Sequence, residues 1–212
     1  MSGTIGDAGT VSTSSTETTE STGTTETTLP PETSTTAPAE TTTTLGSQGT
    51  MTISVYFTRD EKITPVHRVI PQTKEVGAAA IKALLAGPTA AEKAFGLGTN
   101  IPDGTTFLGL SIKNGVATLD LSKEYASGGG SLSMFARLAE VVYTLTQFPS
   151  VKGVQLKLDG KPVEVFGGEG LVLDHPLTRA DFEDLTPAIL VESPCIGDKI
   201  KSPVRIYGSA NV

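Results

Sequence analysis

The residues that could carry chemistry are few in this sequence, and they are scattered. The two histidines are His67, in "PVHRV", and His175, in "LDHPL", and neither has a second ligand at metal-binding spacing. The single cysteine, Cys195, excludes an internal disulfide and a multi-thiolate metal site. Its surroundings, "VESPCIGDKIKSP", contain no histidine that could activate the thiol. We therefore expect no metal site and no cofactor.

Asp120 and Glu124 are a pair of carboxylates that could, in principle, perform general acid–base catalysis. They fall at the end of a predicted strand and in the loop after it. Nothing near them in the sequence would raise one pKa or supply a nucleophile. The motifs G-x-S-x-G, S-x-x-K and H-E-x-x-H are also missing. We predict no catalytic residues, and we keep an enzyme built on this pair as the alternative.

Glycines gather in two places, Gly128 to Gly130 and Gly167 to Gly170. Neither cluster has the strand–glycine–helix order of a dinucleotide site or the Lys-Ser/Thr pair of a P-loop. The first cluster could present free N–H groups to an anion at the start of a helix. A flexible turn is the favoured interpretation of both.

Only the chain after about residue 50 can form a scaffold for such residues. Residues 1–50 contain 19 threonines and six acidic residues, with no lysine, arginine or aromatic residue. A segment of this composition buries too little apolar surface to offset the backbone entropy of folding, roughly 1 to 2 kcal/mol per residue. Residues 1–50 are therefore predicted to be a disordered Thr/Glu-rich stalk that holds a domain away from a surface.

The charge of the remaining chain argues against nucleic-acid binding. The whole sequence has a net charge of -7, with 16 basic and 23 acidic residues. Removing the six acidic residues of the stalk leaves 17 acidic against 16 basic residues. A nearly neutral domain without a basic cluster lacks the phosphate-neutralising surface that nucleic acids require.

The first elements of the domain follow from hydrophobic periodicity. Residues 51–60 alternate, with Ile53, Val55 and Phe57 facing inward, and predict a strand. The segment "TPVHRVIP" predicts an edge or irregular strand because of its prolines. A helix follows in "TKEVGAAAIKALLAGP", with Thr73 as the N-cap and Gly87-Pro88 as the stop.

Asn114-Gly115 is the preferred centre of a type I′ turn and fixes the register of the next two strands. Pairing Lys113 with Val116 places six apolar residues on one face. The predicted pairs are Ile112 with Ala117, Leu110 with Leu119, and Leu108 with Leu121. The other face carries Gly109, Ser111 and Thr118, and we predict that these small residues form an interaction surface.

A second helix and a crossover complete the predicted domain. Phe135, Leu138, Val142 and Leu145 recur at helical spacing, and Pro149 ends the pattern. A strand at Val154, Leu156 and Leu158 follows. The Asp159-Gly160 turn then returns the chain through Val163 and Val165.

The last forty residues predict a different organisation. Residues 171–186 have the composition of an interdomain linker. Residues 187–212 contain two short extended runs separated by Ser-Pro and Gly-Asp turns, as at the start of an all-β sandwich. We expect a partial second domain there.

Several of these motifs together resemble the GerMN domain of sporulation and spore-germination proteins. They are "LLAGP", "IPDGT", "GVATLDLS" and "YTLTQFPSVKGVQLKLDG", within residues 51–170. The C-terminal run "ILVESPCIGDKIKSPVRIYGSANV" resembles the opening of an immunoglobulin-like Gmad2 domain. The fold class expected is α/β, an α+β sandwich with a small mixed sheet and two helices, followed by the first strands of a truncated β-sandwich.

The resemblance implies a function as well as a fold. GerMN proteins are extracytoplasmic, often lipid-anchored, and regarded as non-catalytic. We therefore expect a binding or assembly module of the cell envelope, whose partner is an envelope protein, a wall component or a second copy of the chain. Membrane attachment would need an anchor that this sequence does not contain. The alternative is a wall-associated hydrolase or ligand-binding enzyme.

Overall fold

A computed structural model of the protein describes residues 49–168 and 170–210. The predicted stalk, residues 1–50, therefore lies outside the described residues except for its last two, and Thr50 already belongs to the first strand. Among the helices described, none combines the length and the apolar character that crossing a membrane requires.

The strands β1 (Thr50–Arg59) and β2 (Lys62–Pro71) pair along their whole length as an antiparallel hairpin. The predicted inward residues of β1 are buried. Strand β2 is an edge strand, as predicted, but it is regular rather than irregular. Pro65 lies opposite Tyr56, whose backbone N–H points away from β2 and donates to Thr144 Oγ1 at 3.1 Å. This pair makes no ladder hydrogen bond, so the missing N–H of Pro65 costs nothing.

Helix α1 (Val76–Leu85) ends at Gly87-Pro88 as predicted, with a φ of 73° at Gly87. The predicted N-cap is wrong. Glu75 occupies the N-cap position, and the Thr73 hydroxyl accepts a hydrogen bond from the Glu75 N–H instead. A short helix that the sequence did not predict, α2 (Ala90–Ala94), follows and is held by a capping box between Thr89 and Glu92.

The mixed sheet has the order β3–β4–β5–β6. It contains β3 (Phe107–Lys113), β4 (Val116–Leu121), β5 (Gly153–Leu158) and β6 (Lys161–Pro162). Strands β4 and β5 are parallel, and the other two pairs are antiparallel. This confirms the α/β class and the small mixed sheet.

The register of the β3–β4 hairpin is confirmed from Lys113–Val116 to Leu110–Leu119. Both turn residues, Asn114 and Gly115, have positive φ values, 52° and 82°. The pairing of Leu108 with Leu121 is wrong. A bulge places Phe107 opposite Leu121, so Leu108 points outward and is 50% exposed. The extra residue of a bulge reverses the alternation beyond it.

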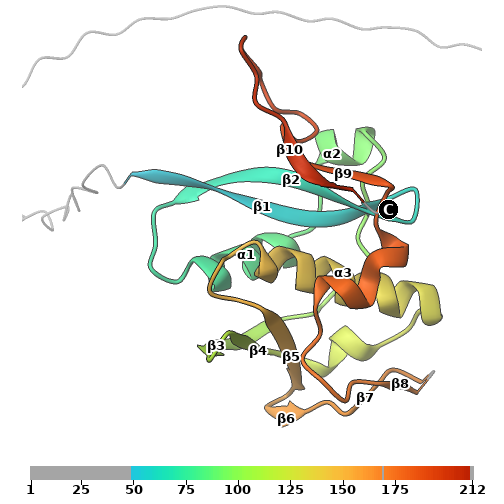
Figure 1. The fold of residues 1–212 in the computed structure, drawn as a ribbon. Coiled ribbons are helices and arrows are strands. Elements are labelled where there is room, and N and C mark those ends of the chain that lie inside the picture. Colours follow the sequence, from blue (N-terminus) through green and yellow to red (C-terminus); the bar gives the residue numbers. More distant parts are fainter. Residues whose placement is uncertain (1–48, 169, 211–212) are drawn as a thin grey trace, which may run out of the picture. The chain divides into compact units, whose positions relative to one another are not determined.

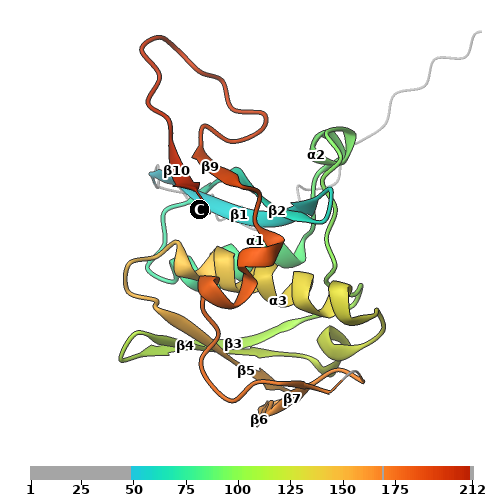
Figure 2. The same cartoon turned by 45° about the vertical axis from the view of Figure 1, so that its right-hand side comes forward.

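Helices α1 and α3 (Ser131–Thr146) lie between the β1–β2 hairpin and the β3–β5 sheet, as both ribbon views show (Figures 1 and 2). Three of the predicted inward residues of α3 are buried, namely Leu138, Val142 and Leu145, and Phe135 is partly exposed. Because α3 is enclosed on several sides, some of its polar residues are buried as well. The short 3-10 helix η1 (Lys123–Ala126) precedes α3.

Arg137 is the largest polar side chain buried with α3. Its guanidinium donates to the carbonyl oxygens of Tyr125 at 2.7 Å, Ser127 at 2.9 Å and Gly128 at 3.0 Å. Its Nε is the one buried side-chain nitrogen or oxygen of the described residues without a partner. Arg137 thereby fixes the loop between η1 and α3.

Glu140, one turn further along α3, holds the loop before β3. Its carboxylate accepts hydrogen bonds from the Thr99 hydroxyl at 2.5 Å and from the Asn100 backbone N–H at 2.8 Å. Burial raises the pKa of Glu140 to about 7, although these hydrogen bonds oppose the shift. At the end of the helix, the Gln147 amide accepts from the Ser54 N–H and donates to the Ser54 carbonyl. Gln147 therefore substitutes for a neighbouring strand at the edge of β1.

Beyond β6 the chain departs from the predicted hairpin. Val163 still donates to the Leu156 carbonyl, but β7 (Val165–Phe166) pairs with β8 (Leu171–Val172) instead of continuing along β5. Val165 is exposed, whereas Phe166 is fully buried. The two-residue Asp159-Gly160 turn is present, with both φ values positive.

Residues 171–186, predicted as a linker, make extensive contacts with the rest. Leu177 forms a bridge with Val154 of β5. Phe182 and Leu185, in the 3-10 helix η2 (Arg179–Leu185), are buried in the same hydrophobic core as α3. Strands β9 (Ile189–Ser193) and β10 (Tyr207–Ala210) then form a two-stranded sheet, of which Leu190 reaches that core. The boundaries of the predicted second domain stay predictions.

Candidate functional site

The predicted interaction surface lies on the outer face of the mixed sheet. Ser111 of β3, Thr118 of β4 and Gln155 of β5 form one cross-strand row. Ser111 and Gln155 are exposed, and Thr118 is half-buried. Gly109 belongs to the next row, opposite Asp120. The structure thus brings the three predicted residues onto neighbouring positions of one face.

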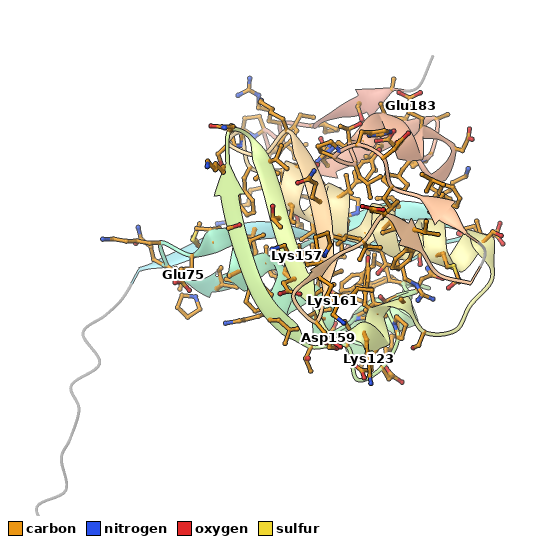
Figure 3. All side chains as sticks on the ribbon, turned by 90° about the horizontal axis from the view of Figure 1, so that it is seen from below. Glu75, Lys123, Lys157, Asp159, Lys161 and Glu183 are labelled. Carbon is orange, nitrogen blue, oxygen red and sulfur yellow. The ribbon has the colours of Figure 1, made fainter. Side chains whose placement is uncertain are left out.

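No helix within the described residues, 49–168 and 170–210, covers this outer face. The buried residues Ala117, Leu119 and Leu156 alternate with the outer row and face α1 and α3, which lie on the other side of the sheet (Figures 1 and 2). Figure 3 views the molecule from the uncovered side, where Lys157 and Lys161 also lie. A sheet packed on one face and open on the other is a common arrangement for strands of mixed polarity.

The open face is bounded on one side by the chain after β6. Together they form a groove of about 330 Å3. The groove mixes hydroxyl, amide, charged and apolar groups, including those of Ser111, Thr118, Gln155, Lys157, Val163 and His175. The pKa of His175 is raised by a hydrogen bond with the Pro176 carbonyl and by the nearby Asp181 and Asp174 carboxylates. The groove therefore offers polar contacts, and its charged side chains include both acidic and basic ones.

Asp120 and Glu124, the carboxylates of the alternative enzyme hypothesis, make contacts that do not favour general acid catalysis. The Asp120 carboxylate accepts the Gly160 N–H at 3.0 Å, which fixes the Asp159-Gly160 turn. Glu124 lies in η1, and a hydrogen bond from Ser122 holds its pKa below the usual value. A general acid needs a raised pKa, so the shift has the opposite sign.

Both glycine clusters lie in connecting segments, where their backbones take part in hydrogen bonds or helix capping. Gly130 occupies the N-cap position of α3, and the Gly128 carbonyl accepts from Arg137. A Cβ on Gly129 would lie 2.7 Å from Arg137 Nη2, so this position requires glycine. Gly167 accepts from the Gly170 N–H in the turn between β7 and β8.

A second, larger cleft of about 590 Å3 lies beside the outer edge of β1. Its centre is Arg179 of η2, whose guanidinium donates to Glu192 Oε1 at 2.8 Å and lies 4.6 Å from the ring centre of Tyr143. The Tyr56 hydroxyl donates to the same Glu192 oxygen at 2.5 Å. Burial raises the pKa of Tyr56, and the Glu192 carboxylate adds to the shift. We call Tyr56, Arg179 and Glu192 the Arg179 cluster.

At the rim of this cleft the structure brings His67 and Cys195 together with Asp198, a grouping that the sequence did not predict. His67 Nδ1 lies 2.7 Å from Asp198 Oδ2, and Cys195 Sγ lies close to both. Burial raises the pKa of the Cys195 thiol to about 12, with Asp198 and Glu192 adding to the shift. No local motif reveals this group, because His67 is more than 120 residues from its partners in the sequence.

The model of the Germane family, described as "Sporulation and spore germination", matches residues 54–164 of this chain. The chain belongs to the Germane family. This confirms the resemblance to GerMN domains predicted from the sequence. The match covers the three layers and the open sheet face, and it ends before Arg179, Glu192, Cys195 and Asp198. The family match does not extend to the C-terminal segment predicted to resemble Gmad2.

Known proteins similar to this Germane chain include one curated relative and several solved structures. Lipoprotein LpqB of Thermobifida fusca (strain YX) is 30% identical over 146 residues, which cover 66% of this chain and 22% of that protein. The chain thus spans about a fifth of the length of that relative.

Among solved structures, the tandem GerMN domains of the sporulation protein GerM from Bacillus subtilis share the fold. They match with a TM-score of 0.52 at 21% identity, over 63% of this chain and 48% of that one. The first GerMN domain of the same protein matches at 24% identity with a TM-score of 0.49, over 62% and 99% of the respective chains.

Proposed function

We propose that this Germane chain is a non-catalytic binding or assembly module of the bacterial cell envelope. It acts outside the cytoplasm, as part of a lipoprotein or a secreted wall protein. Its family and its similarity to lipoprotein LpqB support the location. The Thr-rich residues 1–50 would serve as the stalk that holds the domain away from the surface.

The observation that carries the proposal is the uncovered sheet face beside the groove. Ser111, Thr118 and Gln155 present short or flexible polar side chains in one row, and small residues let another backbone approach closely. The groove beside this row bears mixed polar and apolar groups, which suit contact with an extended protein segment. An envelope protein is the expected partner, and a second copy of the chain is the alternative.

We propose further that residues 187–212 are the first strands of an immunoglobulin-like domain. Their antiparallel β9–β10 pair and exposed apolar side chains support it, since strands of a sandwich bury one face against a second sheet.

The test compares two double variants of the full chain. Ser111→Arg with Thr118→Arg places two bulky charges on the open face. Ala91→Arg with Ala94→Arg places the same charges on the exposed surface of α2, away from this sheet (Figure 1). Folding of both is checked by circular dichroism.

Crosslinked pulldown from envelope extract should recover the partner with wild type and with the α2 variant. Recovery should fall strongly with the sheet-face variant. Equal recovery with both variants would contradict the proposed surface. An activity screen on wall polymers is run in parallel, and turnover by wild type would contradict the non-catalytic role.

A further inference from the structure

Three side chains of different chemistry lie close together where the loop after β9 contacts β2. His67 comes from β2, and Cys195 and Asp198 come from the loop after β9. One ligand atom of each, a ring nitrogen, the thiol sulfur and a carboxylate oxygen, lies within 4.8 Å of the other two. Such a set is the first requirement of a metal site.

We infer that His67, Cys195 and Asp198 bind a zinc ion. Sulfur, imidazole nitrogen and carboxylate oxygen are the three ligand types that zinc accepts in proteins. Magnesium and calcium prefer all-oxygen ligands, which this group does not offer. The inference concerns a part of the molecule separate from the open sheet face and does not depend on the function proposed for that face.

The distances are compatible with a zinc ion after small rotations of the side chains. Zinc bonds of about 2.0 to 2.3 Å place the ligand atoms of a tetrahedron roughly 3 to 4 Å apart. His67 Nδ1 and Asp198 Oδ2 are now 2.7 Å apart, so their hydrogen bond would open and both atoms would turn toward the ion. The backbone N–H of Cys195 donates to Asp198 Oδ2 at 2.7 Å and already orients that carboxylate.

The group is sheltered yet reachable from solvent. The side chains of His67 and Asp198 are 20% and 25% exposed, and Cys195 is buried. His67 also lines the cleft of about 590 Å3 that contains the Arg179 cluster. This cleft provides an entry path to the His67 side of the group.

Binding requires two ligand atoms, the Cys195 sulfur and His67 Nδ1, to lose the protons that they carry in their present hydrogen bonds. In the metal-free protein the Cys195 thiol donates to the Glu192 carbonyl at 3.3 Å. As the Zn–S bond forms, the thiol proton passes to solvent and the sulfur binds as thiolate. His67 Nδ1 gives up to solvent the proton of its hydrogen bond with Asp198, and the imidazole binds through Nδ1 as the neutral tautomer with its proton on Nε2. Asp198 binds as carboxylate. The ion would then tie the loop after β9 to β2.

The sequence supplies a matched control in its second histidine. His175 Nε2 lies 3.7 Å from Asp174 Oδ1 and 3.6 Å from Asp181 Oδ1, so it also combines an imidazole with carboxylates. This surface group includes no sulfur, because Cys195 is the only cysteine of the chain. His175→Gln therefore measures how much a histidine–carboxylate cluster without sulfur contributes to metal binding.

The experiment uses the full chain without an affinity tag, in reduced form, titrated with cobalt(II) and then with zinc(II). We expect one cobalt ion per chain, a thiolate-to-cobalt charge-transfer band, and loss of that band when zinc displaces cobalt. Cys195→Ser should abolish the band, and His67→Gln should weaken binding more than about tenfold. His175→Gln should leave both unchanged.

A second readout needs no variant. Zinc should slow the alkylation of Cys195 by iodoacetamide, because the sulfur becomes a metal ligand. The inference is overturned if wild type shows no thiolate band, if zinc leaves the alkylation rate unchanged, or if His175→Gln weakens binding as much as His67→Gln does.

Discussion

Two regions of the molecule are stabilised by different contacts. The first is residues 54–164, which the family model matches, and the second is residues 189–210. The first region encloses α3, and its buried polar side chains Arg137, Glu140 and Thr144 are hydrogen-bonded inside it. In the second region Leu190 and Cys195 are buried, while Ile189, Ile200 and Ile206 are exposed. Its links to the body combine the core contact of Leu190 with the polar contacts of Glu192 and Asp198.

The difference indicates which region unfolds cooperatively and which region can open locally. Side chains buried on all sides make the first region cooperative, since each lost contact leaves a buried group without a partner. The second region is attached through Leu190, the Arg179 cluster and the His67–Asp198 contact, and we expect it to loosen without unfolding the core. The predictions below test this contrast, from the largest expected effect to the smallest.

Replacing Arg137 by methionine should destabilise the first region most. The buried carbonyl oxygen of Tyr125 and the partly buried carbonyl oxygens of Ser127 and Gly128 would lose their donor, and the apolar replacement would lie in the buried position of the Arg137 side chain. We expect the free energy of unfolding to fall by about 3 kcal/mol or more. Urea denaturation measures this, with Lys93→Met on the exposed side of α2 as the control. If both variants unfold at the wild-type midpoint, Arg137 does not hold the loop.

Glu140 should make stability depend on pH. Its pKa is about 7 in the folded protein, against an ordinary value of 4.5, so between these pH values the folded state retains a proton that the unfolded state has lost. Stability from this group is therefore complete below about pH 4.5 and is lost as the pH rises through 7, by about 3 kcal/mol in total.

Glu140→Gln removes the titrating group and keeps its shape. The free energy of unfolding of this variant, measured between pH 4.5 and 7.5, should fall less steeply than that of wild type. Parallel pH profiles for the two proteins would show that Glu140 titrates normally.

Gly115→Val should destabilise the β3–β4 hairpin by about 1 to 3 kcal/mol. Gly115 has a φ of 82°, which a β-branched residue resists. The control is Gly98→Val, where a Cβ would meet nothing within 4 Å and φ is not in the left-handed region. A wild-type denaturation midpoint for Gly115→Val would contradict the assigned turn.

Arg179→Gln should act on the second region with little effect on the first. Losing the ion pair with Glu192 and the stacking on Tyr143 would weaken the attachment of β9 by about 1 to 2 kcal/mol. Amide exchange near Leu190 should become roughly 5 to 30 times faster, while exchange in α3 stays at the wild-type rate. Equal acceleration in both places would mean that the two regions unfold together.

Local signals made much of this fold predictable. The Asn114-Gly115 and Asp159-Gly160 turns are each specified by two adjacent residues whose backbone preferences are intrinsic, and both are present. The helix end at Gly87-Pro88 and the inward residues of β1 follow from equally local patterns. These features need no information from distant parts of the chain.

The features that the sequence did not reveal depend on distant partners. Arg137 and Glu140 have the polarity of solvent-facing helix residues, and they are buried because a second layer covers α3. The bulge at Phe107 and Leu108 changes the register by one residue, and the adjacent Gly109, an isolated glycine inside the strand pattern, is a local signal that the predicted register did not take into account. His67, Cys195 and Asp198 meet only because the loop after β9 crosses β2.

The central claim is that the open sheet face, and not the rest of the surface, contacts the partner. Site-specific photocrosslinking tests it most directly, with a photoreactive residue at Ser111 in one full-length protein and at Ala94 on α2 in another. Our account predicts that, in envelope extract, position 111 gives a discrete adduct whose mass identifies a partner protein or a second copy, and that position 94 gives none. The same adduct from position 94, or no adduct from position 111, would contradict it.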